Sequence, residues 1–123
     1  MKISEAIAKV DNLRPNQYGM DVKMQWLSEV EGMVIDNILN RTEGNDISFE
    51  KYDYELDNEK ELLVPDRFCD LYLHYLIAKI DYHDNETESY MNDVTMYQAS
   101  YDAFAAWYIR NHMPKQPGVI RGW

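Results

Sequence analysis

The side chains best suited to metal binding or catalysis are three histidines and a single cysteine in a chain of 123 residues. Asp70 and His74 are four residues apart, a spacing that places both on one face of a helix. A protein metal site needs three or four ligands that converge on one point. His83 lies about 13 Å further along a helix, too far to share an ion with His74. We therefore expect Asp70 and His74 to form a surface hydrogen bond or ion pair, and we expect no metal.

Cys69 is the only cysteine. A reactive thiolate needs positive surroundings and a histidine oriented toward it. Arg67 is the only cation close in sequence, and His74 lies five residues away, on a different helix face. We expect Cys69 to be a packed core thiol. One cysteine also excludes an internal disulfide and a cysteine-based zinc cluster, which fits a reducing compartment.

Sequence signatures of catalysis are absent. The chain has no G-x-S-x-G, Walker-type lysine loop, G-x-G-x-x-G or H-E-x-x-H motif. With 22 acidic residues, any one pair of carboxylates carries little information. A metal-dependent hydrolase that uses Asp70 and His74 is a weak alternative. We expect no enzymatic activity and no cofactor.

Charge is distributed unevenly along the chain. The formal net charge is −10, with −13 over residues 1–109 and +3 over the last fourteen residues. Between Glu43 and Glu61 there are eight acidic residues and two lysines. A body of this sign repels phosphate, so nucleic-acid binding is disfavoured as the main activity. The acidic residues either form a solvated surface, or the acidic segment and the basic tail meet on neighbouring copies of the chain.

Apolar residues recur at helical spacing in four stretches and predict a mainly α fold with about four helices. The short link at residues 83–86 predicts that the third and fourth helices form a long antiparallel pair. No apolar run is long enough to span a membrane, and the first residues lack the apolar centre of a signal peptide. The four stretches are residues 3–10, ended by Pro15; residues 26–38, ending near Asn40; residues 65–80; and residues 90–108, ended by Met113 and Pro114.

The helical pattern breaks around residues 43–64. Ile47 and Phe49 alternate with polar residues, and residues 61–64 form a second short apolar run, so a small β-hairpin or extended loop is expected. A two-stranded hairpin is only marginally stable alone and would need a partner surface. We expect one helical domain over residues 1–114, followed by an extended C-terminal tail over residues 115–123.

Aromatic residues suggest where partners bind. The ten tyrosines either form a core whose hydroxyls reach the surface or lie between subunits, where tyrosine and tryptophan are enriched. Trp123 follows a stretch with two helix breakers and has no obvious place in its own core, so we expect it to dock on a partner. The candidate protein–protein contacts are Ile47, Phe49, Tyr52, Tyr54, Arg110, Lys115, Val119, Ile120, Arg121 and Trp123.

Several segments together are similar to a known family. They are residues 3–7 with 14–16, residues 26–29 before the acidic segment, residues 61–65 leading into 70–73, residues 80–82, and residues 108–114. The pattern resembles head–tail connector (head-completion adaptor) proteins of tailed phages and prophages. It covers nearly the whole chain to about Pro114 and contains no catalytic signature.

The resemblance implies a helical structural protein that forms a ring, typically of about twelve copies, below the portal. Such a protein extends the DNA channel and joins capsid to tail, and DNA passes without specific binding. The implied partners are the portal protein, neighbouring copies and the next neck or tail-completion protein, with no membrane. The implied location is the virion neck, after synthesis in the bacterial host cytoplasm. The alternative is a small acidic helical adaptor or inhibitor that binds one protein partner without forming a ring.

Overall fold

The computed structural model describes residues 1–115 and contains four α-helices. This confirms the predicted mainly α fold. No strand occurs within residues 1–115, where only isolated bridges join extended segments. The elements in chain order are α1 (Ile3–Leu13), α2 (Met20–Asn37), the short 3-10 helices η1 (Leu39–Arg41) and η2 (Asp66–Phe68), α3 (Asp70–His83) and α4 (Thr87–Asn111).

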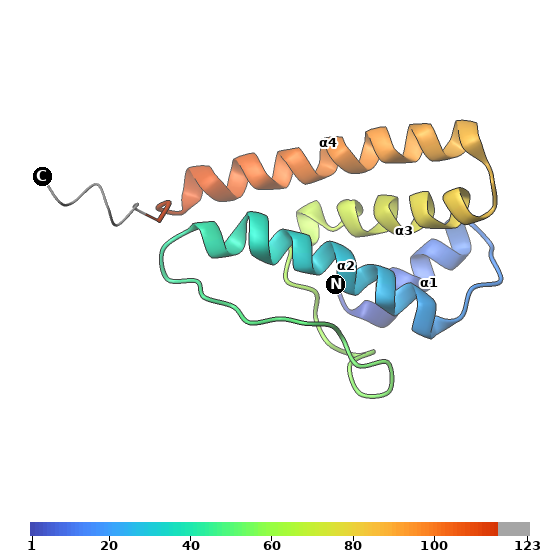
Figure 1. The fold of residues 1–123 in the computed structure, drawn as a ribbon, viewed down its shortest axis with the longest axis horizontal. Helices are drawn as coiled ribbons and strands as arrows, with labels where there is room; N and C mark the ends of the chain where they lie inside the picture. Colours follow the sequence, from blue (N-terminus) through green and yellow to red (C-terminus); the bar gives the residue numbers. More distant parts are fainter. Residues whose placement is uncertain (116–123) are drawn as a thin grey trace, which may run out of the picture.

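Helices α3 and α4 lie side by side and run in opposite directions, as predicted (Figure 1). The turn between them includes Asn85 with φ of 60°, a left-handed conformation that asparagine tolerates better than most residues. Helix α4 is longer than α3 and continues past it to the end of α2 (Figure 1). There the hydroxyl of Tyr101 donates to the carbonyl of Met33 at 3.3 Å. The long antiparallel pair is thereby connected to the rest of the bundle.

Helix α2 forms the centre of the core, and α4 lies at its edge. α2 is covered by α1, by α3 and by the 43–64 segment, so its buried residues are spread around much of its circumference. Helix α4 has 25 residues, yet Phe104 is the only one fully buried. The largest fully buried side chains include Tyr72, Phe104, Ile3, Met24, Leu27, Ile35, Leu71, Leu76 and Ile80.

The expected β-hairpin is wrong, because the two arms of the 43–64 segment bind different partners. In the first arm, the side chain of Asn40 bonds both the N–H and the carbonyl of Ile47, at 2.8 and 2.9 Å. Further along, the N–H of Tyr52 donates to the hydroxyl of Ser28 at 2.9 Å. The side chains of Asn40, in η1, and Ser28, in α2, therefore form the hydrogen bonds with the loop backbone that a second strand would have formed.

The second arm of this loop covers the beginning of α1. The N–H groups of Ile3 and Ser4 donate to the carbonyls of Lys60 and Asn58, at 2.9 and 2.8 Å. The first N–H groups of a helix have no partner within the helix and must find acceptors elsewhere. The loop supplies these acceptors. Its second arm is therefore held in place by hydrogen bonds to α1 and not by pairing with a strand.

Residues 113–115 return to the start of the same loop. The N–H of Lys115 donates to Arg41 O at 2.9 Å, and the N–H of Glu43 donates to Met113 O at 2.8 Å. The chain beyond α4 therefore leaves the bundle beside the end of α2. Within residues 1–115, no helix has the length and apolar character that a membrane span requires.

Candidate functional site

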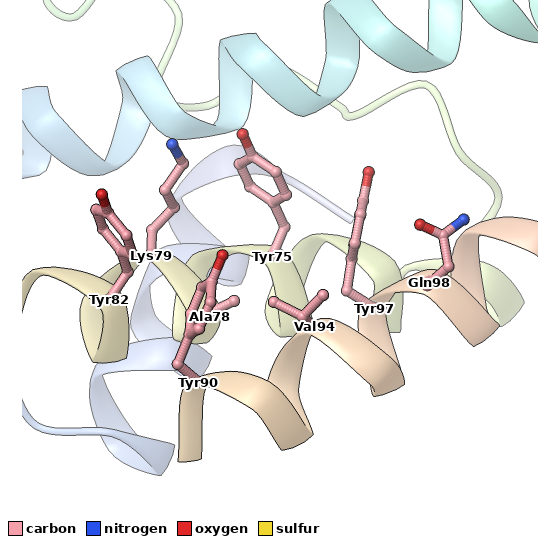
Figure 2. A pocket seen from close by; sticks show the side chains of 8 residues that line it. All are labelled: Tyr75, Ala78, Lys79, Tyr82, Tyr90, Val94, Tyr97 and Gln98. Carbon is pink, nitrogen blue, oxygen red and sulfur yellow. The ribbon is translucent and has the colours of Figure 1, made fainter. Parts of the chain in front are cut away.

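An open groove with a volume of about 500 Å³ lies between α3 and α4 (Figure 2). Four tyrosines dominate it, two from each helix. In Figure 2 their hydroxyls point toward the same side of the helix pair. We call this feature the tyrosine groove; it is lined by Tyr75, Ala78, Lys79, Tyr82, Tyr90, Val94, Tyr97 and Gln98.

The antiparallel register of α3 and α4 creates the groove. Tyr75 pairs with Tyr97 at a ring-centroid separation of 5.2 Å, and Tyr82 pairs with Tyr90 at 5.4 Å. Each pair joins the two helices at one end of the groove. Between the pairs the lining includes Ala78 and Val94 (Figure 2). These side chains are small, so they leave a hollow that the large rings border.

One ion pair neutralises the cation of the groove. Lys79 Nζ lies 3.2 Å from Glu29 Oε1 on α2 and 5.6 Å from the ring centroid of Tyr75. The hydroxyl of Tyr75 donates to the same Glu29 oxygen at 2.9 Å. Burial, followed by this bond to Glu29, raises the pKa of Tyr75. Burial also raises the pKa of Tyr97, to about 12. The hydroxyls of Tyr75 and Tyr97 are therefore uncharged at neutral pH.

Phenol rings around a small aliphatic floor favour a ligand with an apolar or aromatic anchor. Aromatic rings bury a large area at low entropic cost, which is why they are common at protein–protein contacts. Tyr82 is 59% exposed and Val94 is 36% exposed, so the hollow is accessible from solvent. The arrangement provides a binding surface.

A buried carboxylate connects the loop to the core on the other side of α2. Glu31 is fully buried and accepts bonds from the hydroxyls of Tyr52 and Tyr72, at 2.5 Å each, and from the N–H of Leu63 at 3.0 Å. Burial and the nearby Glu31 charge raise the pKa of both tyrosines, which remain donors. This is a structural cluster, since three donors satisfy the carboxylate.

A second buried carboxylate lies between α1, α3 and α4. Asp81 is 1% exposed, and its Oδ1 lies 2.5 Å from the guanidinium of Arg14. Asp93 approaches Asp81 from α4, and burial together with its bond to Asp81 raises the pKa of Asp93 to about 7. Asp93 on α4 therefore interacts with Asp81 on α3 near the groove.

The predicted contact residues of the loop are distributed between core and surface. Ile47 and Phe49 are half-buried, and Phe49 packs edge-on against Tyr52. Tyr52 itself belongs to the core, bound to Glu31, whereas Tyr54 is 53% exposed. Arg110 and Lys115 are exposed near the end of α4. The remaining four predicted contacts, Val119, Ile120, Arg121 and Trp123, lie outside the described residues.

The residues considered for chemistry do not converge. Cys69 is buried as expected; its thiol donates to Val64 O at 3.3 Å, and burial raises its pKa to about 11. Within residues 1–115, no ion pair or hydrogen bond joins Asp70 to His74, so the predicted pair is not formed. No group of three potential metal ligands forms in the same part of the chain.

The tyrosine groove was not among the predicted contacts, although the sequence contains a signal for it. Tyr75 and Tyr82 are seven residues apart and therefore lie on one face of the third helix. Tyr90 and Tyr97 have the same spacing and lie on one face of the fourth helix. With small residues midway between them, antiparallel packing of the two faces predicts a hollow bordered by rings. The sequence does not give the register of α3 against α4 that places these small residues opposite each other.

Comparison with known proteins gives no relative: no protein-family model matches the chain, and no curated protein or solved structure is significantly similar to it.

Proposed function

We propose that this protein is a structural subunit of the neck of a tailed phage or prophage. It is a head–tail connector that binds below the portal as a ring, extends the DNA channel and joins capsid to tail. The family resemblance of the sequence supports this function, and the helical fold agrees with what that resemblance implies. The observation that carries the proposal is the open tyrosine groove, an aromatic binding surface on a helix pair.

Ring geometry requires two unlike surfaces on each subunit. In a closed ring the contacts run head to tail, so the patch given by one copy differs from the patch it receives. The tyrosine groove lies on the α3–α4 pair, and the basic residues Arg110 and Lys115 lie near the other end of α4. One chain therefore presents two chemically different surfaces that are well separated.

The acidic surface suits a DNA channel. An excess of carboxylates along the channel would repel phosphate and let DNA slide without sticking. The exposed acidic residues of the 43–61 loop, such as Glu50, Glu55 and Glu59, are available for this role. They would equally serve as contacts with the portal or the next neck protein.

Electron microscopy of the protein mixed with portal rings tests the function. The candidate portal protein from the same genome is purified as a ring, incubated with an excess of the chain, and imaged in side view. A connector adds a layer of density to one end of the portal, coaxial with its channel. Unchanged portal rings, combined with binding to a single cellular protein, would support the non-ring adaptor instead.

A further inference from the structure

The tyrosine groove lacks an occupant among residues 1–115. Its walls are phenol rings, its floor is Ala78 and Val94, and its one cation is paired with Glu29. A ligand for such a site has an aromatic or branched aliphatic anchor. The faces of tyrosine rings also attract a guanidinium or ammonium group, so a cation beside that anchor adds affinity.

Residues 119–123 of this chain carry the required groups. Val119, Ile120 and Trp123 are apolar, and Arg121 adds a cation among them. No acidic residue occurs after residue 109, whereas residues 1–109 have a net charge of −13. The segment is therefore complementary to the groove in apolar character and to the whole acidic body in charge.

Val119 and Ile120 follow the end of α4 too closely to reach the groove of their own subunit. Val94 lies seventeen residues before Asn111, about 25 Å along α4 at 1.5 Å per residue. Lys115 follows the end of α4 and is held beside Arg41. Val119 and Ile120 lie four and five residues further, a reach of about 13 to 18 Å when fully extended. The groove is thus out of range of these residues in the same copy.

We propose that the tyrosine groove of one copy binds residues 119–123 of a neighbouring copy, with Trp123 seated between the two tyrosine pairs. The inference rests on the proposed function and names the joint between adjacent subunits. Because the groove and the segment are unlike, each copy gives one contact and receives another, which is the requirement for a ring. Opposite charge on the two partners speeds their encounter at low salt.

A labelled peptide tests the contact directly. A fluorescein-labelled peptide of residues 115–123 is titrated with the full chain carrying Trp123→Ala, and binding is followed by anisotropy. We expect saturable binding that weakens roughly tenfold or more when Val94→Lys fills the hollow, or when the peptide itself carries Trp123→Ala. Met96→Lys is the matched control, because Met96 is exposed on α4 outside the groove, and it should change affinity less than about twofold.

Complementation distinguishes binding between copies from binding within one. Full chains with Val94→Lys or Trp123→Ala are measured separately and mixed, by light scattering after chromatography. Each variant alone should stay at 14.6 kDa. Their mixture should form a complex of twice that mass, because one intact segment meets one intact groove. Circular dichroism confirms that both variants are folded.

Three results would overturn the proposal: no saturable peptide binding, equal effects of Val94→Lys and Met96→Lys, or a Val94→Lys chain that assembles like the natural one. If that variant also still joins the portal, the connector function stands and only this joint is wrong. If the peptide binds the groove but the natural chain ignores the portal, the contact stands and the connector function fails.

Discussion

Asp81 and Asp93 face each other across the α3–α4 pair, and Arg14 binds only the first of them. Asp81 is buried with its counterion, whereas Asp93 approaches from α4 and bonds to Asp81. Burial and the neighbouring Asp81 carboxyl disfavour the charged form of Asp93 and raise its pKa to about 7. This contact between α3 and α4 therefore depends on pH.

Replacing Asp93 with Asn should stabilise the protein at high pH. The pKa of Asp93 is raised from 3.8 to about 7 in the folded chain. Folded protein thus binds a proton more tightly than unfolded protein, and Asp93 makes stability fall as pH rises from about 4 to about 7. Asn keeps a donor toward Asp81 at every pH. The melting temperature of Asp93→Asn relative to the natural chain should rise between pH 4 and pH 8.

Asp102→Asn provides the control for this experiment, because Asp102 is an exposed carboxyl further along α4. Its effect on melting temperature should vary little between the two pH values. A constant difference between Asp93→Asn and the natural chain across this range would contradict the raised pKa of Asp93.

Removing Arg14 should destabilise the protein strongly. Arg14→Ala leaves Asp81, 1% exposed, without its cation. Breaking a buried ion pair by deleting one partner costs on the order of 3 kcal/mol, because an unpaired charge stays behind. Urea unfolding at pH 7 measures the loss. Lys9→Ala, an exposed lysine on α1, should cost less than about 0.5 kcal/mol, and equal costs would refute the role of Arg14.

Removing Glu31 should loosen the 43–64 loop as well as the core. Glu31→Ala leaves the hydroxyls of Tyr52 and Tyr72 and the N–H of Leu63 without their acceptor. Each unsatisfied buried donor costs about 1 to 3 kcal/mol, so the free energy of unfolding should fall by roughly 3 kcal/mol or more. Hydrogen exchange should speed up at Leu63. Glu29→Ala on the same helix, where the carboxylate is partly exposed, should cost about 1 kcal/mol or less; a larger loss at Glu29 than at Glu31 would contradict this assignment.

Cys69 should react slowly with thiol reagents in the native protein. Its thiol is buried, bonded to Val64 O, and has a pKa raised to about 11 by burial. Little thiolate exists at neutral pH, and the reagent cannot approach it. Modification by an aromatic disulfide reagent should follow the unfolding transition in urea. Rapid native-state modification at pH 7.5 would show that the thiol is accessible.

Periodicity was enough to predict the helices but could not decide between a hairpin and an extended loop for the segment between α2 and α3. Ile3, Ala6, Ile7 and Val10 recur at helical spacing because one face of α1 is buried, so sequence and structure agree there. The alternation around Ile47 and Phe49 is equally strand-like. Its backbone groups, however, bond to Asn40 and Ser28 and not to a second strand. Spacing within a segment does not reveal which distant side chain takes its hydrogen bonds.

The tyrosine groove likewise could not be predicted from spacing within one helix, because it depends on how α3 and α4 align. Two pairs of tyrosines at seven-residue spacing indicate ringed helix faces, and the sequence left open whether the tyrosines form the core or lie between subunits. The alignment of Tyr75 with Tyr97 and of Tyr82 with Tyr90 follows from the length of the turn and the packing of Phe104. Composition alone could not separate these exposed rings from Tyr72, which is fully buried.

The most direct test of the connector function is the mass of the protein by light scattering during chromatography, alone and mixed with its candidate portal. We predict a ring many times larger than 14.6 kDa, or stoichiometric co-elution with the portal that restores such a ring. A chain that remains at 14.6 kDa at every concentration and elutes apart from the portal would contradict the account.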